Sequence, residues 1–199
     1  SEMFGEHRGK PFNEKDSFYP LSPYGISKSA AHVIANYFRE KFQLRIYCGI
    51  LFNHDSELRS ENFVTKKIVS SFVKIKLGLL KTITLGNINI SRDWGYAPEY
   101  VEAIHSQLQL DNPTDLIIGT GQTNSLTEFL IEVMTQLNLG TNVADYVEIS
   151  SELSRKTDII YNSADLSQSK LLINWTPKYK MENLIEKMLS FEFKKLRRQ

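Results

Sequence analysis

The chain has 199 residues, of which 41% are hydrophobic and 24% charged, and its formal net charge is +1. These values are typical of a globular protein of one or two domains, and the balanced charge gives no electrostatic reason to expect nucleic acid as a partner. The sequence has no apolar run long enough to cross a membrane, no secretory signal at its start and one cysteine. We therefore expect a cytoplasmic protein without membrane partners and without an intrachain disulfide.

Helical and extended patterns alternate along the chain. Residues 1–20 are polar, contain Pro and Gly, and predict a loop. Apolar spacing and capping residues predict helices over 23–42, 63–77, 97–110 and 125–139, a helical turn near 167–172 and a terminal helix from about 181. Apolar runs predict strands over 44–52, 82–85 and 116–119 and extended segments over 146–149 and 158–161. The alternation indicates an α/β protein in which 44–52 is a buried parallel strand that includes a small buried Cys48.

The start of the first helix carries a pair of residues suited to proton transfer. Ser22 is a natural N-cap and Pro23 suits the first helical position, so residues 22–28, SPYGISK, open a helix. Tyr24 and Lys28 then lie one turn apart on one face. A free tyrosine loses its proton near pH ~10, and a neighbouring ammonium stabilises the phenolate. The pair can therefore take a proton from a substrate hydroxyl.

The same spacing occurs a second time in the predicted helix, at Tyr37 and Lys41. On a helical wheel Tyr37 falls in line with Ile26, Ala30 and Val33, an apolar stripe that predicts a core-facing surface. Tyr24 points away from this stripe. We therefore interpret Tyr37 as a packing residue and Tyr24 as the candidate for chemistry.

Several further segments occur in an order that resembles one family over most of the chain. The SPYGISK segment is similar to the start of the catalytic helix in the extended branch of the short-chain dehydrogenase/reductase family. Within that branch the chain most resembles the dehydratases of nucleotide sugars. The segments that carry this resemblance are GILFNH at 49–54, ENFVTKKI at 61–68, LGN at 85–87, RDWGYA at 92–97, and Lys170 with WTP at 175–177.

The resemblance implies an NAD(P)-binding fold of which this chain contains only a part. No G-x-G-x-x-G turn follows a predicted strand, although a dinucleotide-binding fold needs that turn against the pyrophosphate. We therefore expect a partial NAD(P)-binding Rossmann-like sheet with a smaller α/β substrate-binding domain. Residues 1–60 would be the end of the NADP-binding domain, and residues 61–199 mainly the substrate domain, with some segments returning to the sheet. The first βαβ units would lie outside the chain.

The resemblance also implies a reaction and the residues that perform it. Tyr24 takes the proton from the sugar O4 as hydride leaves C4 for NADP, and Lys28 favours the phenolate and binds the nicotinamide ribose. Glu2, which matches the end of a T-S-E segment, then removes the C5 proton and protonates the departing C6 hydroxyl. The alternative for Glu2 is a terminal surface carboxylate, and for Lys28 a lysine on the helix surface.

Other residues are implied to hold the two ligands. The resemblance assigns Asn53 to the substrate, and it assigns His54 and Arg59, together with Tyr24 and Lys28, to NADP. For Asn53 and His54 the alternative is an ordinary turn, and for Arg59 it is a solvated loop arginine. Lys67, Arg92, Arg155 and Asp158 match the residues that hold the nucleoside diphosphate, where cationic side chains neutralise phosphates. Two positions depart from the family pattern, because Lys156 replaces a proline and Asp158 is shorter than the usual glutamate. An ion pair of Arg92 with Asp93 beside a packed Trp94 is the alternative for the RDW segment.

We expect a 4,6-dehydratase of a GDP-sugar, in the first instance GDP-mannose, that recycles NADP and forms homo-oligomers. The alternatives are another extended-branch enzyme on a nucleotide sugar, namely a GDP-heptose dehydratase, an epimerase or a reductase, and a non-catalytic fragment. The isolated chain is expected to be inactive. His7, His32 and His105 have no ligand-like spacing with each other or with cysteine, so the sequence predicts no metal site.

Overall fold

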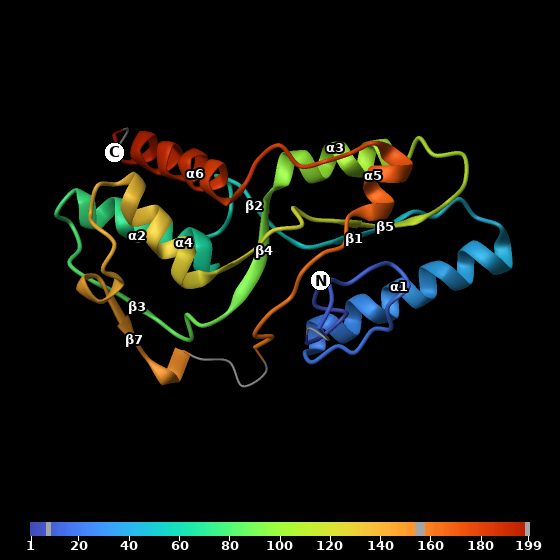
Figure 1. Cartoon of the computed structure of the whole chain (residues 1–199), viewed down its shortest axis with the longest axis horizontal. Coiled ribbons are helices and arrows are strands. Elements are labelled where there is room, and N and C mark those ends of the chain that lie inside the picture. Colours follow the sequence, from blue (N-terminus) through green and yellow to red (C-terminus); the bar gives the residue numbers. More distant parts are fainter. Residues whose placement is uncertain (7–8, 154–157, 198–199) are drawn as a thin grey trace.

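A computed structural model describes residues 1–6, 9–153 and 158–197 of the chain. The molecule is elongated, and helices and strands alternate along it (Figure 1). The helices are α1 (Pro23–Phe42), α2 (Val64–Lys76), α3 (Ala97–Gln107), α4 (Leu126–Gln136), α5 (Ser167–Ile173) and α6 (Met181–Leu196). The strands are β1 (Cys48–Leu51), β2 (Asn53–Asp55), β3 (Ile83–Leu85), β4 (Ser91–Tyr96), β5 (Asp115–Ile118), β6 (Thr123–Ser125) and β7 (Val147–Ile149). Two 3₁₀ turns, η1 (Val143–Asp145) and η2 (Ser151–Leu153), flank β7.

One end of the molecule is built on a parallel pair of strands that are distant in sequence. β1 pairs with β5 so that Ile50 lies beside Ile117 and Leu51 beside Ile118. One apolar cluster on this pair joins Phe4, Phe12, Phe52 and Ala164, and a second joins Tyr100, Ala103 and Trp175 to Ile118. The segment 115–118 therefore returns to the strand that follows α1, and apolar side chains cover the pair.

A second sheet connects the two ends of the molecule. β2 runs parallel to β4, with Asn53 beside Trp94, and β4 runs antiparallel to β6. Only the residue Phe52 separates β1 from β2, so the chain passes from one sheet directly into the next. Side chains of β2 and β4 therefore lie close to the carboxyl end of β1.

The other end of the molecule is a helical layer on a short parallel sheet. β3 pairs with β7, and α2, α4 and α6 pack together around the largest apolar cluster, which includes Phe72, Phe129 and Met188. Lys66 of α2 and Glu192 of α6 form a buried ion pair within this layer. Among the helices that the structure describes, none combines the length and the apolarity that a membrane span requires.

Helix α4 has the capping box that the sequence predicts. The Ser125 hydroxyl accepts a hydrogen bond from the Glu128 backbone N–H at 3.1 Å, and the Glu128 carboxylate accepts one from the Ser125 N–H at 2.6 Å. These bonds lower the pKa of Glu128, because they stabilise its charged form. The box fixes the point at which β6 becomes α4, whose apolar face lies in the largest cluster.

The substitution Ser125→Ala should lower the free energy of unfolding by about 1 kcal/mol, because it leaves a backbone N–H of the first turn without its acceptor. Urea unfolding of the chain measures this loss. Thr135→Ala is the matched control on the same helix, since the Thr135 hydroxyl donates only to the Ile131 carbonyl within the helix. Equal unfolding midpoints for the two variants would contradict a role for the cap.

The extended segments depart from the sequence prediction in length and number. The predicted strand over 44–52 is strand only at Cys48–Leu51, and Cys48 is half-buried where a buried residue was expected. The segment 158–161 makes a single bridge, between Tyr161 and Ser91. β2, β4 and β6 were not predicted, because their polar residues lack the alternation that signals a strand.

The prediction that the apolar stripe of α1 faces the core is wrong. Ile26, Val33 and Tyr37 are 56%, 62% and 55% exposed, and Gly25 is the buried residue of this helix. The side chains turned toward the strands are polar, because His32 and Arg39 both bind Asp115 of β5. The Tyr37 ring instead packs along its own helix, against Phe38 and Phe42.

Candidate active site

Tyr24 and Lys28 project from the first turns of α1 as the sequence predicts. The Ser22 hydroxyl accepts a hydrogen bond from the Gly25 N–H at 3.0 Å, and Pro23 occupies the first turn. The Lys28 ammonium lies 5.5 Å from the centroid of the Tyr24 ring, so the two side chains share a face. Tyr24 is 60% exposed. Within the part of the chain that the structure describes, neither the Tyr24 hydroxyl nor the Lys28 ammonium has a hydrogen-bond partner, which leaves both for a ligand.

Glu2 is held against this same first turn. The Ser22 hydroxyl donates a hydrogen bond to a Glu2 carboxylate oxygen at 3.4 Å. A Cβ on Gly25 would lie 2.7 Å from the Glu2 carbonyl oxygen, so a glycine is needed for the backbone of residue 2 to reach the helix. The Ser1 nitrogen donates to the Leu51 carbonyl at the end of β1 at 2.7 Å. The structure thus brings Glu2, the start of α1 and the carboxyl end of β1 together.

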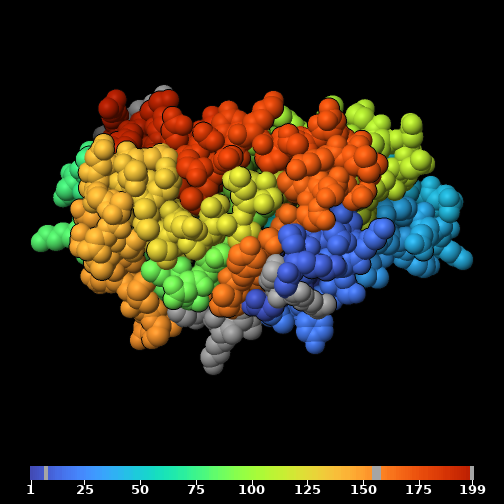
Figure 2. Space-filling view, viewed as in Figure 1, coloured from blue at the N-terminus to red at the C-terminus, as the bar shows by residue number. Residues whose placement is uncertain are grey.

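The turn after Glu2 anchors it from the other side. Gly5 has a φ of +73°, and a Cβ there would lie 2.2 Å from the Tyr19 carbonyl oxygen, so this turn also requires glycine. The Tyr19 N–H donates to the Met3 carbonyl at 2.9 Å, and the Phe4 ring stacks on Phe12 at 4.7 Å. Phe12 in turn bridges to Ala164, and the space-filling view shows the N-terminal residues lying against the segment after residue 158 (Figure 2).

Asn53 and His54 lie in β2 rather than in the turn that the sequence suggested. The side-chain oxygen of Asn53 is buried and has no hydrogen-bond partner among the described residues. A His54 ring nitrogen, Nδ1, lies 2.9 Å from the Phe52 carbonyl and donates to it, which leaves Nε2 as an acceptor. A buried amide oxygen without a donor is unfavourable, so Asn53 has the environment of a ligand-binding side chain.

Arg59 is engaged within the chain. Its Nε lies 2.8 Å from an Asp55 carboxylate oxygen, and its guanidinium lies 3.5 Å from the centroid of the Phe63 ring. Burial raises the pKa of Asp55, and Arg59 and a hydrogen bond from Thr65 oppose that rise. Arg59 therefore compensates the negative charge of the buried Asp55 carboxylate. The contact of Arg59 with a cofactor stays a prediction.

The residues predicted for the nucleoside diphosphate are distributed over β4, α2 and the segment near 158. Arg92 is buried in β4, two residues from Trp94, which is the register partner of Asn53. Lys67 lies in the first turns of α2, and its ammonium donates to the Thr84 carbonyl of β3 at 2.7 Å. Asp158 is half-buried, and Arg155 lies outside the described residues. The structure therefore places Asn53 and Arg92 on neighbouring strands and Lys67 on a different element.

Asp93 is a further buried residue beside the site, which the sequence suggested only as an ion-pair partner of Arg92. Its carboxylate accepts hydrogen bonds from the Thr120 N–H at 2.8 Å, the Thr120 hydroxyl at 2.6 Å and the Gly121 N–H at 2.8 Å. Burial raises the pKa of Asp93 to about 6, and these hydrogen bonds oppose the rise. Asp93 thus ties β4 to the loop after β5. The sequence also suggested that Trp94 packs beside this pair. That packing is confirmed, since the Trp94 ring lies 5.4 Å from the Phe129 ring between centroids.

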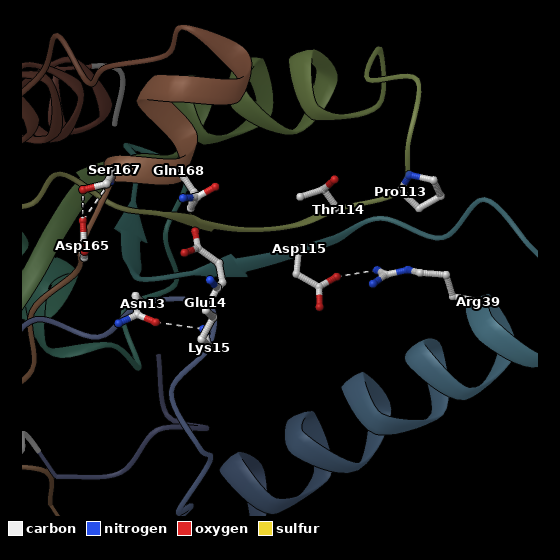
Figure 3. A pocket seen from close by; sticks show the side chains of 10 residues that line it. All are labelled: Asn13, Glu14, Lys15, Arg39, Pro113, Thr114, Asp115, Asp165, Ser167 and Gln168. Carbon is white, nitrogen blue, oxygen red and sulfur yellow. Dashed lines mark hydrogen bonds and ion pairs between the residues drawn. The ribbon is translucent and has the colours of Figure 1, made fainter.

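A surface hollow lies apart from these residues (Figure 3). Residues from the loop at 13–15, the end of α1, the start of β5 and the segment 165–168 line it, and among them Arg39 and Asp115 form an ion pair. None of the predicted site residues that the structure describes lines this hollow. It is therefore a separate feature from the grouping around Tyr24.

Comparison with known sequences identifies the family. The sequence profile described as "GDP-mannose 4,6 dehydratase" matches residues 1–188. The chain belongs to the GDP-mannose 4,6-dehydratase family. The resemblance inferred from the motifs is therefore confirmed.

Named relatives from plants and animals agree with this assignment. GDP-mannose 4,6 dehydratase 1 of Arabidopsis thaliana is 40% identical over 199 residues, and the match covers 100% of this chain and 54% of that protein. GDP-mannose 4,6 dehydratase of Homo sapiens is 35% identical over 212 residues, which cover 99% of this chain and 57% of that protein. The chain thus spans about half the length of these relatives.

Solved structures show the same fold. The structure of RMD from Pseudomonas aeruginosa complexed with NADPH superposes with a TM-score of 0.88 at 17% identity, covering 98% of this chain and 64% of that one. A dTDP-glucose 4,6-dehydratase from Bacillus anthracis in complex with NAD gives a TM-score of 0.84 at 21% identity, covering 97% of this chain and 59% of that one. The predicted α/β class with parallel strands is therefore confirmed.

Proposed function

We propose that this chain forms the substrate-side part of an NADP-dependent 4,6-dehydratase that converts GDP-mannose to GDP-4-keto-6-deoxymannose. The observation that carries the proposal is the placement of Glu2 against the helical turn that presents Tyr24 and Lys28. This reaction needs a base for a hydroxyl and a second group that works as both base and acid, and the three side chains supply these roles. The chain covers about half of its relatives, so the activity belongs to a longer polypeptide that includes the remaining part.

Tyr24 and Lys28 serve the oxidation at C4. The Tyr24 oxygen is exposed and has no partner among the described residues, so it is free to bind the sugar O4 and, as the phenolate, to accept its proton. The Lys28 ammonium lies 5.5 Å from the centroid of the Tyr24 ring, close enough to contact a ligand that the Tyr24 oxygen binds. NADP supplies the chemistry of accepting a hydride from C4 and returning it to C6.

Glu2 serves the loss of water. A 4-ketone acidifies the neighbouring C5–H, and the Glu2 carboxylate takes that proton. The carboxylic acid so formed protonates the C6 hydroxyl as it departs, so one group acts first as base and then as acid. The hydrogen bond from Ser22 and the close contact with Gly25 hold the residue in place for both steps.

The residues present fit a nicotinamide cofactor and a nucleotide sugar. Lys28, His54 and Arg59 are the groups that would hold NADP, and Asn53 offers a buried oxygen without a donor for the substrate. Lys67, Arg92 and Arg155 would neutralise the diphosphate, and Asp158 would bind the ribose. Arg92 is buried in β4, two residues from Trp94, the register partner of Asn53, and this neighbourhood supports its role.

Two neighbouring proposals keep the same site. A GDP-heptose offers the same O4, C5 and C6 chemistry as GDP-mannose. The site geometry therefore supports a 4,6-dehydratase of a GDP-sugar but does not distinguish the two sugars. An epimerase or a reductase has no need for the C5 base that Glu2 provides. We further propose that the protein is cytoplasmic and that it forms homo-oligomers. The apolar stripe of α1 with Ile26, Val33 and Tyr37, which lies uncovered in this chain, supports the homo-oligomer.

A fusion protein tests the proposed function. The part of the Arabidopsis relative that this chain does not cover is joined to residues 1–199 and incubated with NADP and GDP-mannose. We expect a product lighter by one water and no net change in NADPH absorbance, because the hydride is returned in each turnover. The chain alone is the control and should be inactive, because it has no glycine-rich turn to hold the pyrophosphate of NADP. A fusion that binds NADP but leaves GDP-mannose unchanged would contradict the proposal.

A further inference from the structure

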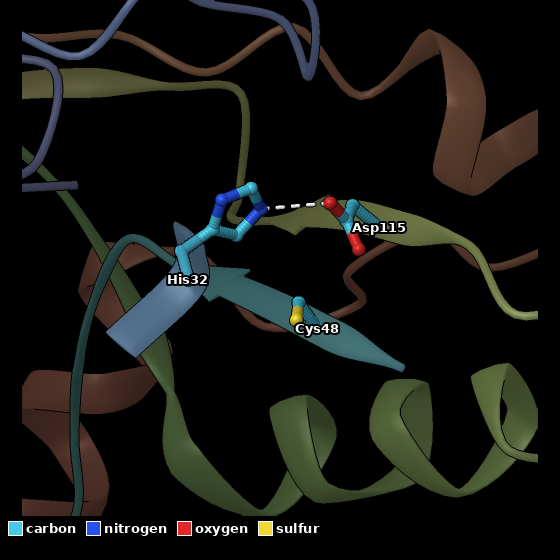
Figure 4. A group of neighbouring side chains, drawn as sticks. All are labelled: His32, Cys48 and Asp115. Carbon is cyan, nitrogen blue, oxygen red and sulfur yellow. Dashed lines mark hydrogen bonds and ion pairs between the residues drawn. The ribbon is translucent and has the colours of Figure 1, made fainter. Parts of the chain in front are cut away.

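Three side chains with metal-binding donors meet between α1 and the β1–β5 sheet, away from Tyr24 and Glu2. His32 comes from α1, Cys48 from β1 and Asp115 from β5 (Figure 4). One donor atom of each, a ring nitrogen, the thiol sulfur and a carboxylate oxygen, lies within 4.8 Å of the others. The residues are distant in sequence, which is why the spacing of the histidines gave no sign of a site. Two strands that pair in register, with Cys48 beside Asp115, bring them together.

The surroundings of His32 suit a metal ligand. Its Nε2 lies 2.7 Å from Asp115, and its Nδ1 lies 3.3 Å from the side-chain amide of Asn36. The Asn36 oxygen is buried and has no partner among the described residues. Because amide oxygen and nitrogen are interchangeable by a flip, the oxygen can instead accept from a protonated Nδ1. That arrangement leaves Nε2 free for a metal, and a hydrogen bond of this kind orients most metal-bound histidines.

Asp115 is also arranged so that one oxygen is available. One carboxylate oxygen, Oδ1, binds the Arg39 guanidinium, and the other, Oδ2, faces His32. Arg39 is held in place by a second bond, from its Nε to the Ile46 carbonyl at 2.7 Å. The guanidinium also donates to the Cys48 sulfur at 3.7 Å, which opposes the rise in the pKa of this thiol that burial causes. Arg39 thus supports the two anionic ligands from one side without using the oxygen that faces His32.

We propose that His32, Cys48 and Asp115 bind one zinc ion. An imidazole, a thiolate and a carboxylate are ligands that zinc takes in a tetrahedral site, and the fourth position is left to water. The two anions balance the charge of Zn²⁺, and Asp115, one of the three ligands, also lines the nearby hollow (Figure 3). The ion would fasten α1 to both strands at a place where the helix buries polar rather than apolar side chains. This site is independent of the proposed dehydratase reaction.

Cobalt titration of the purified chain tests the proposal. Co²⁺ replaces zinc in such sites and absorbs in the near ultraviolet when a thiolate is bound. Cys48 is the single cysteine of the sequence, so any thiolate-to-cobalt absorption comes from this residue. We expect a saturable signal at one Co²⁺ per chain that is displaced by Zn²⁺.

Variants inside and outside the proposed zinc site should differ in cobalt binding. Cys48→Ser should abolish the charge-transfer absorption, and His32→Gln should weaken binding, whereas His105→Gln, on the exposed face of α3, should change nothing. Asn36→Ala keeps all three ligands and removes the partner of His32 Nδ1, so it should weaken binding about 10-fold to 100-fold, as loss of such a partner does in other sites. Far-ultraviolet circular dichroism confirms that each variant is folded. A folded chain without thiolate-to-cobalt absorption, or equal affinity in His32→Gln and His105→Gln, would overturn the proposal.

Discussion

The substitution Tyr24→Phe should lower kcat of the fusion protein about 10²-fold to 10⁴-fold, the range that general acid–base groups contribute. Phenylalanine keeps the ring and its contact with Lys28 but has no oxygen to accept the proton from O4. NADP should stay bound, because Lys28, His54 and Arg59 are unchanged. Steady-state turnover of GDP-mannose and fluorescence titration of NADPH measure the two quantities separately.

Tyr37→Phe is the matched control for this experiment. Tyr37 repeats the spacing of Tyr24 along the same helix and is similarly exposed, at 55% against 60%. Its ring contacts Phe38 and Phe42 rather than any candidate site residue, so its hydroxyl should be dispensable for turnover. If Tyr24→Phe turned over as fast as Tyr37→Phe, Tyr24 would have no role in catalysis.

The sequence predicts the helices of this protein well because their signals are local. Ser22 and Pro23 mark the start of α1, and Ser125 with Glu128 marks the start of α4, at the residues where the structure begins those helices. Each cap uses hydrogen bonds between residues at most three apart, so no distant partner is needed to recognise it.

The strands around the site are harder to predict because distant residues stabilise them. β4 contains Arg92, Asp93 and Trp94, and its polar residues are buried by β2, β6 and the loop at 120–121. The buried carboxylate of Asp93 accepts hydrogen bonds from backbone N–H groups about 27 residues away. A pattern within one segment of sequence cannot reveal such a partner.

The orientation of α1 also depends on distant residues that a local sequence pattern does not contain. The apolar stripe with Ile26, Val33 and Tyr37 indicates a buried face, yet the polar face with His32 and Arg39 lies on the sheet. Periodicity identifies which side chains share a face, but it does not say which neighbour covers that face. Here the contacts of His32 and Arg39 with Asp115 hold the polar face on the sheet, and the apolar face stays exposed.

The second large effect is expected at Glu2, where Glu2→Gln should separate oxidation from the loss of water. Glutamine keeps the shape of the side chain and can still accept the hydrogen bond from Ser22, but it cannot take the C5 proton. Tyr24 still serves the oxidation at C4, so hydride leaves the sugar and is not returned. In the fusion protein we expect NADPH absorbance to rise to a stoichiometric amount while no product lighter by one water is formed.

Glu6→Gln is the control for this separation, because it makes the same chemical change four residues away. The Glu6 carboxylate accepts a hydrogen bond from the Ile160 N–H at 3.0 Å, and a glutamine oxygen can accept that bond as well. Dehydration should therefore continue in Glu6→Gln, with no accumulation of NADPH. Continued dehydration in Glu2→Gln would instead remove Glu2 from the mechanism, and the contact between residue 2 and Gly25 would then serve only to fasten the N-terminal segment to α1.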